Sequence, residues 1–286
     1  MAGETQAKKL RLVVLVSGSG TNLQAMIDRI ADGRLHAEIA AVISDNPDAF
    51  GLERAEKHGI PAVVIDYSKY SKKHLENIPW EKLPEHFNQI VQSQRLFPHL
   101  HGSKLRERLA RMVLAEQELV AIIDSYKPDY ICLAGFMRLL SPYFVRHYQE
   151  TTAEQNQGTD RNLAGWRIIN IHPALLPAFP GVNGYGDTFE YGCRFGGITV
   201  HFVDEGEDTG PIIGQAIYPI WPGDSLEDIK KRGLSLEYEL YSQCLNWLAF
   251  GYVEIHPEHT ERTVFRITDP GYKDFMSNLV ALSMKI

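Results

Sequence analysis

Apolar residues in the first part of the chain fall into two kinds of pattern. Short continuous apolar runs at Leu10 to Val16, Glu38 to Ile43 and Ala62 to Ile65 are typical of buried strands. The segments between them, at residues 23–30 and Phe50 to His58, have the spacing of amphipathic helices. This β-α-β-α-β order predicts a parallel sheet with right-handed crossovers.

The same alternation continues to about residue 250. A helix over Leu105 to Tyr126 leads into a fourth strand, Tyr130 to Leu133. Further strands are predicted at residues 168–171, 197–203 and 212–220, and then a helix to about Ala249 that begins with Ser225 as N-cap and Asp228 in a capping box. We expect an α/β fold with an open, mostly parallel, doubly wound sheet, in a single domain over residues 1–286.

Three segments do not follow this alternation of strands and helices. Residues 69–102 contain three prolines and four histidines, and we expect an exposed insertion with short helices. The histidines lack metal-ligand spacing, so no metal site is predicted. The polar stretch at 149–165 reads as a second surface insertion, and residues 251–286 as a hairpin or edge strands followed by a helix or tail.

Composition narrows the class of protein. A net charge of −7 disfavours a nucleic-acid partner. No apolar run approaches the roughly 18 residues needed to cross a bilayer, so no membrane association is expected. Cys132, Cys193 and Cys244 form no C-x-x-C pair, which indicates reduced thiols. We expect a cytoplasmic protein, and the sequence does not predict its oligomeric state.

The turn after the first strand is a candidate anion site. Its sequence, S-G-S-G-T-N over Ser17 to Asn22, joins a strand to a helix start, where glycines and free N–H groups suit a phosphate. The third glycine of a dinucleotide fingerprint is replaced by Leu23, and no G-K-[ST] follows. A phosphate monoester therefore fits better than NAD, and a tight turn without a ligand is the alternative.

Two polar side chains end the strand at residues 168–172. Asn170 and His172 are two residues apart and so point the same way, at a sheet edge where ligands bind in open α/β folds. Asp208 sits at a T-G-P corner between two later strands, from which it could reach a neighbouring strand end. Without further evidence, an Asn and a His at a strand end are more often a hydrogen-bonded structural pair than a catalytic one.

Two further features have an alternative interpretation. The loop A-G-F-M-R-L-L-S-P, residues 134–142, follows the fourth strand and suits the wall of a pocket for a flat heterocycle. It could equally be a capping loop that buries Phe136 and Met137. Glu237 lies within the long helix, where an exposed glutamate is the ordinary case.

Taken together, five ordered motifs resemble the folate-dependent formyltransferases over residues 10–68 and 104–250. They are V-S-G-S-G-T-N-L-Q-A, D-A-F-G-L-E-R-A, L-A-G-F-M-R-L-L-S-P, N-I-H-P-A-L-L-P-A-F and V-H-F-V-D-E-G-E-D-T-G-P-I-I. The resemblance implies a Rossmann-like formyltransferase fold. It also implies a reaction of de novo purine biosynthesis, in which a formyl group passes from 10-formyltetrahydrofolate, the co-substrate, to the amine of 5-phosphoribosylglycinamide. The resemblance implies no metal in this reaction.

The resemblance also implies residue roles. Asn170 and protonated His172 would donate to the oxyanion of a tetrahedral intermediate, and Asp208 would hold His172 charged and order a water that moves the proton. The remaining positions would bind the two substrates. The phosphate and ribose would be bound by Ser19, Gly20, Thr21, Asn22 and Glu237. The folate and the glycinamide would be bound by Gly135, Met137, Arg138, Leu139, Leu140 and one of Arg111 or Arg108.

The sequence departs from this family at two places near the implied centre. Ala174 stands where the family usually has serine, and Val182 to Thr188 replaces a histidine-bearing run. Two other functions therefore stay open: hydrolysis of formyltetrahydrofolate, and non-catalytic binding of nucleotide or folate. The phosphate turn and Glu237 favour a nucleotide acceptor over water.

Overall fold

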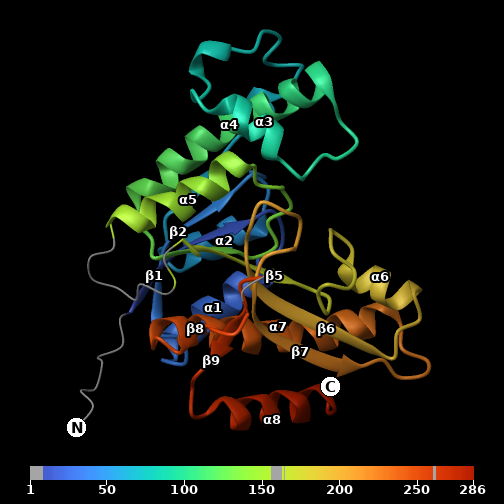
Figure 1. The fold of residues 1–286 in the computed structure, drawn as a ribbon. Helices are drawn as coiled ribbons and strands as arrows, with labels where there is room; N and C mark the ends of the chain where they lie inside the picture. Colours follow the sequence, from blue (N-terminus) through green and yellow to red (C-terminus); the bar gives the residue numbers. More distant parts are fainter. Residues whose placement is uncertain (1–8, 156–162, 164, 260–261) are drawn as a thin grey trace.

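A seven-stranded sheet forms the centre of the computed structural model, which describes residues 9–155, 163, 165–259 and 262–286 (Figure 1). The strand order is β3-β2-β1-β4-β5-β6-β7. The pairs from β3 to β5 are parallel, and β6 and β7 are antiparallel additions, so the predicted mostly parallel sheet is confirmed. The strands are β1 (Leu10–Val16), β2 (Ala37–Ser44), β3 (Ala62–Val64), β4 (Tyr130–Leu133), β5 (Ile168–His172), β6 (Phe195–Phe202) and β7 (Ile212–Pro219).

Helices cover both faces of this sheet. One face packs against α1 (Thr21–Ala31), α2 (Phe50–Lys57) and α7 (Leu226–Ala249), and the other against α4 (Gly102–Ser125) and α5 (Pro142–Gln155). Successive residues of β1 enter opposite cores, since strand side chains alternate between the two faces. Both faces are therefore buried, which explains why the strands read as continuous apolar runs.

The start of α7 has the predicted capping box. Ser225 N donates to Asp228 Oδ2 at 2.8 Å, and Asp228 N donates to Ser225 Oγ at 3.3 Å. This satisfies backbone donors that a helix start leaves free. It fixes where α7 begins and hence which of its residues face the sheet.

The insertion at residues 69–102 is less exposed than expected. Its short helices η1 (Tyr67–Tyr70), η2 (Trp80–Lys82) and α3 (Phe87–Ser93) lie beyond the sheet, against α4 (Figure 1). Phe87 and Ile90 are buried there among apolar residues of α4. The segment therefore has a small core of its own, which stabilises its position beside the sheet.

The predictions for the other two irregular segments had different outcomes. Helix α5 continues to Gln155, so the start of the expected 149–165 insertion is helical, while residues 156–162 and 164 lie outside the described residues. The C-terminal segment forms the hairpin β8 (Val253–Ile255) and β9 (Phe265–Ile267), then α8 (Tyr272–Ser283). Of the alternatives that the sequence left open here, the structure has the hairpin and the helix.

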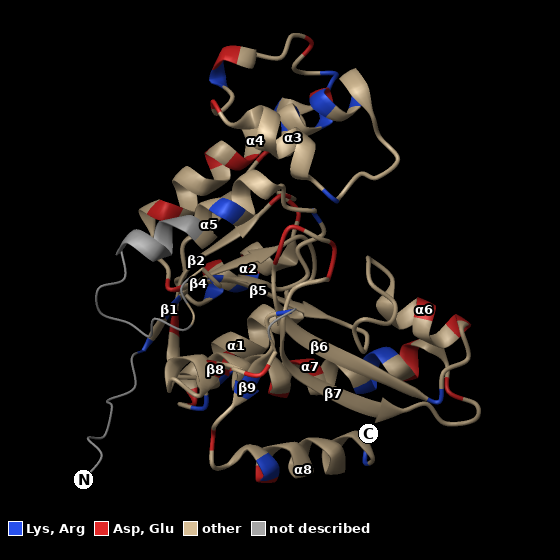
Figure 2. Cartoon of the chain, viewed as in Figure 1, with Lys and Arg blue, Asp and Glu red and all other residues tan. Residues whose placement is uncertain are grey.

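Charged side chains lie mainly on the helices and loops (Figure 2). The strands β4, β5, β6 and β7 contain no lysine, arginine, aspartate or glutamate. None of the helices in the described ranges is long and apolar enough to cross a membrane.

One carboxyl group is buried between α4 and the loop after β4. Glu116 is 1% exposed. It accepts a 2.7 Å hydrogen bond from Ser141 N, and the Ser141 hydroxyl donates to its other oxygen. Burial raises the pKa of Glu116 to about 8, against the lowering effect of both Ser141 bonds. This contact attaches the loop at residues 134–142 to the helix behind it.

Glu116 should make stability depend on pH. The folded state holds its proton up to a pKa of about 8, whereas the ordinary value is 4.5. Stability should therefore fall as pH rises from 4.5 towards 8, and the fall between pH 5.5 and pH 9 should be about 3 kcal/mol. Glu116→Gln keeps one acceptor and one donor for Ser141 but does not titrate, so it should lack this loss. Urea unfolding of both proteins at about pH 5.5 and about pH 9 measures the difference; parallel pH dependences would contradict this account.

Candidate active site

A cavity of about 1080 Å³ opens at the carboxyl ends of the central strands. Its lining includes Ser17 after β1, Gly135 after β4 and Pro173 after β5. The chain passes from β1 to β2 on one side and later returns with β4 on the other side of β1. This reversal of strand order leaves a crevice above the sheet, where α/β folds bind ligands.

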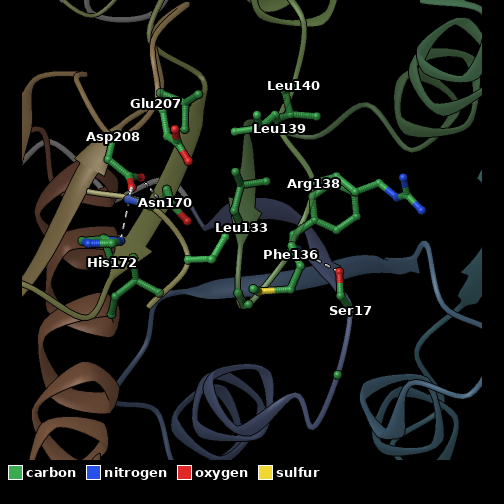
Figure 3. A pocket seen from close by; sticks show the side chains of 18 of the residues that line it. Ser17, Leu133, Phe136, Arg138, Leu139, Leu140, Asn170, His172, Glu207 and Asp208 are labelled. Atoms are coloured by element: carbon green, nitrogen blue, oxygen red, sulfur yellow. Dashed lines mark hydrogen bonds and ion pairs between the residues drawn. The ribbon is translucent and has the colours of Figure 1, made fainter. Parts of the chain in front are cut away.

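The three residues expected to form the catalytic group lie together (Figure 3). Asn170 Nδ2 donates to Asp208 Oδ1 at 3.3 Å. Asp208 Oδ2 is 3.3 Å from His172 Nδ1. The spacing of two along β5 therefore places both side chains on one side of the strand end, and the T-G-P corner brings Asp208 to them.

Asp208 also binds two groups that the sequence did not indicate. Gly181 N donates to its Oδ2 at 2.8 Å, and His201 Nε2 is 3.6 Å from its Oδ1. Burial acts to raise the pKa of Asp208, but the hydrogen bond with His201, the charge of His172 and the Gly181 N–H together lower it below the ordinary value. Asp208 is thus an ionised carboxylate surrounded by donors.

Two neighbours hold the ring of His172. Its Nε2 is 2.7 Å from the carbonyl oxygen of Phe179, which can only accept, so Nε2 carries a hydrogen. Its Nδ1 faces the ionised carboxylate of Asp208. The imidazole of His172 is therefore held between a backbone carbonyl oxygen and a carboxylate.

At one end of the cavity, the β1–α1 turn lies beside Glu237. Gly20 has φ of 65°, and a Cβ there would lie 2.7 Å from Gly51 Cα, so glycine is required. The turn opens α1, whose first N–H groups have no intrahelical acceptor. Ser19, Gly20, Thr21 and Asn22 all line the cavity. This is the geometry of an anion site at a helix start.

Glu237 points into the cavity rather than into solvent. It is 5% exposed, and it accepts hydrogen bonds from Asn22 Nδ2 at 2.6 Å and from the Tyr185 hydroxyl at 2.5 Å. Burial raises the pKa of Glu237, while these two bonds oppose the rise. Tyr185 belongs to α6 (Gly184–Glu190), and its role was not predicted.

The loop after β4 forms the opposite wall (Figure 3). Gly135 O accepts from Ser17 N at 3.0 Å, and Met137 N donates to Ser17 Oγ at 2.9 Å. Leu140 is buried, and so is Phe136, as the capping-loop alternative required. Met137 is 59% exposed, so the loop does not bury Met137 as that alternative also required. Leu139 and Leu140 also line the cavity.

Three arginines have different surroundings in this wall. Arg138 Nε pairs with Asp45 Oδ2 at 2.6 Å, and its guanidinium lies 4.0 Å from the ring centre of Tyr67.

Arg111 Nη1 donates to the carbonyl oxygens of Tyr70 and Leu75 and so holds the insertion. The exposed Arg108 lies 4.2 Å from the ring centre of Phe97. Phe97, Arg108 and Arg111 all line the cavity, which makes the insertion part of its wall.

Comparison with known proteins shows which family the chain resembles. The model of the family described as formyl transferase matches residues 10–153 and 162–245. The chain is 33% identical over 263 residues to the phosphoribosylglycinamide formyltransferase of Escherichia coli (strain K12), covering 92% of this chain and 98% of that protein. It is also 33% identical to the trifunctional purine biosynthetic protein adenosine-3 of Drosophila melanogaster, covering 88% of this chain and 15% of that protein.

A solved structure agrees with these relatives. The glycinamide ribonucleotide transformylase 1 of Symbiobacterium toebii superposes with a TM-score of 0.67 at 34% identity, covering 94% of this chain and 100% of that one. The family model spans all seven strands of the central sheet. The chain therefore belongs to the formyl transferase family.

Proposed function

We propose that this protein transfers the formyl group of 10-formyltetrahydrofolate to the amine of 5-phosphoribosylglycinamide, in de novo purine biosynthesis. The observation that carries the proposal is the cluster of Asn170, His172 and Asp208 at the middle of one cavity. A polar anion site lies at one end of that cavity and an apolar wall at the other. The relatives named for this reaction support it.

The acceptor would lie at the polar end. The N–H groups of the first turn of α1, with Ser19 and Thr21, would bind its phosphate, and the carboxylate of Glu237 would accept from the ribose hydroxyls. The glycinamide arm would then extend past Gly135 and Met137 towards His172. In this orientation the amine points at the centre of the cavity.

The donor would occupy the other wall. Leu139 and Leu140 would enclose its pterin ring, with Arg138 beside it. The carboxylates of its glutamate tail would extend towards the insertion, where Arg108 and Arg111 lie. Neither guanidinium forms an ion pair with a carboxylate among the described residues, and Arg111 already donates to two carbonyls. Arg108 is therefore the better partner for the tail.

In the reaction, the amine nitrogen attacks the formyl carbon and a tetrahedral intermediate forms. Asn170 and protonated His172 would donate hydrogen bonds to its oxyanion, where negative charge develops. Collapse then breaks the bond between the formyl carbon and N10 of the folate. A proton passes from the amine to N10, and Asp208 would hold the water that relays it as well as keeping His172 charged. The products are formylated ribonucleotide and tetrahydrofolate.

Loss of an oxyanion donor should lower turnover strongly. Asn170→Ala and His172→Ala should each reduce kcat by about 10²–10³-fold with little change in KM, because these donors act mainly in the transition state. Asp208→Asn should reduce kcat by a similar factor, since it removes the charge that favours protonated His172. The assay follows tetrahydrofolate release from 10-formyltetrahydrofolate with and without phosphoribosylglycinamide.

His259→Ala provides the control, because this exposed histidine does not line the cavity. Release that requires the ribonucleotide supports the transferase. Release without it indicates a hydrolase instead. Binding of both ligands without release would leave a non-catalytic binding protein.

Arg108→Ala should weaken binding of the donor. It removes the cation proposed for the glutamate tail, so KM for 10-formyltetrahydrofolate should rise about fivefold while KM for the ribonucleotide stays constant. Arg106→Ala is the matched control, since Arg106 lies on the same helix but bonds to Asn88 and stacks on Trp80 and Phe87. Equal effects of the two substitutions would argue against a tail site at Arg108.

A further inference from the structure

Tyr185 is the one cavity residue whose hydroxyl contacts Glu237. It donates to Glu237 Oε1 at 2.5 Å, while Asn22 Nδ2 donates to Oε2 at 2.6 Å. Each carboxylate oxygen accepts up to two hydrogen bonds. The two protein donors therefore fix the plane of the carboxylate and leave each oxygen able to accept one more.

A glycine on α7 makes room for the tyrosine ring. A Cβ at Gly233, one turn before Glu237, would lie 2.4 Å from both Cε1 and the hydroxyl of Tyr185. Glycine is unfavourable inside a helix, so its presence at this position indicates that the close contact with Tyr185 matters there.

A nearby tyrosine shows that packing alone does not require this hydrogen bond. The ring centre of Tyr218 is 6.4 Å from that of Tyr185, and Tyr218 is fully buried. Its hydroxyl has no hydrogen-bond partner among the described residues. Two adjacent tyrosines therefore differ in one respect: only Tyr185 reaches the carboxylate that faces the cavity.

We propose that Tyr185 is a positioning residue that orients Glu237 to accept from both hydroxyls of a vicinal diol, and so sets the preference for ribose over 2-deoxyribose in the acceptor. This inference rests on the proposed function, because it takes the ribonucleotide as the ligand at Glu237. A carboxylate held by two donors offers one free acceptor position on each oxygen, which matches a cis-diol. Without Tyr185 the carboxylate can rotate, and the match is lost.

The test compares Tyr185→Phe with wild type and with Tyr218→Phe. Binding of phosphoribosylglycinamide and of its 2-deoxyribose analogue is measured by calorimetry, and formyl transfer by tetrahydrofolate release. Tyr185→Phe should raise Kd and KM for the ribonucleotide about tenfold and leave kcat within about twofold. The ratio of the two Kd values should shrink towards one. Tyr218→Phe should leave that ratio unchanged.

A double-mutant cycle tests whether Tyr185 acts through Glu237. In a Glu237→Gln background, Tyr185→Phe should cause no further rise in Kd. Additive losses, or an unchanged Kd in Tyr185→Phe alone, would overturn the proposal. Gly233→Ala is a second variant that displaces the ring while keeping the hydroxyl, and it should reproduce the rise in Kd. Thermal unfolding of each variant separates loss of folding from loss of binding.

The outcomes separate this inference from the proposed function. If wild type binds the ribonucleotide but transfers no formyl group, the transferase assignment fails and the Kd comparison still decides the role of Tyr185. If wild type transfers formyl and Tyr185→Phe matches it in Kd and in diol preference, only this inference fails. If wild type does not bind the ribonucleotide, both fail.

Discussion

The carboxylate of Asp208 is the contact on which the site depends. It is the common partner of Asn170 and His172 at the end of β5, of His201 on β6 and of Gly181 in the following loop. Asp208 itself has φ of 53°, a conformation that costs a non-glycine residue roughly 1–2 kcal/mol. Hydrogen bonds from Asn170 Nδ2 and Gly181 N, with two histidine rings beside the carboxylate, offset that cost. Without the carboxylate, Asn170, His172 and the Gly181 N–H would lose the partner that they share.

Strand order determines where this cluster faces. Because the chain reverses direction across the sheet between β1 and β4, the loops after these strands part and leave the cavity open. Ser17 connects the two loops, since its N–H bonds to Gly135 O and its hydroxyl accepts from Met137 N. It also donates to Asp45 at 2.6 Å, which in turn pairs with Arg138. The two walls of the cavity are thus joined at its floor.

Patterns within a single segment of the sequence predicted the features that depend only on the backbone of that segment. The period of two along a strand placed Asn170 beside His172, and the glycine turn after β1 placed the free N–H groups of α1. The contacts that were missed depend on pairing between distant segments. His201 meets Asn170 only because β5 and β6 pair in antiparallel register at those two residues. Tyr185 meets Glu237 only because α6 packs on α7 at Gly233. Neither register nor helix packing can be read from spacing within one segment.

The two departures from the family pattern have unequal consequences. Ala174 is fully buried, its carbonyl accepts a 2.8 Å hydrogen bond from the Thr199 hydroxyl, and it does not line the cavity, so this change concerns packing behind the site. The segment at residues 182–188 does reach the cavity, through Tyr185 and its contact with Glu237. The insertion reaches the opposite end through Phe97. Both segments therefore adjoin the ends of the cavity, while the Asp208 cluster lies between them.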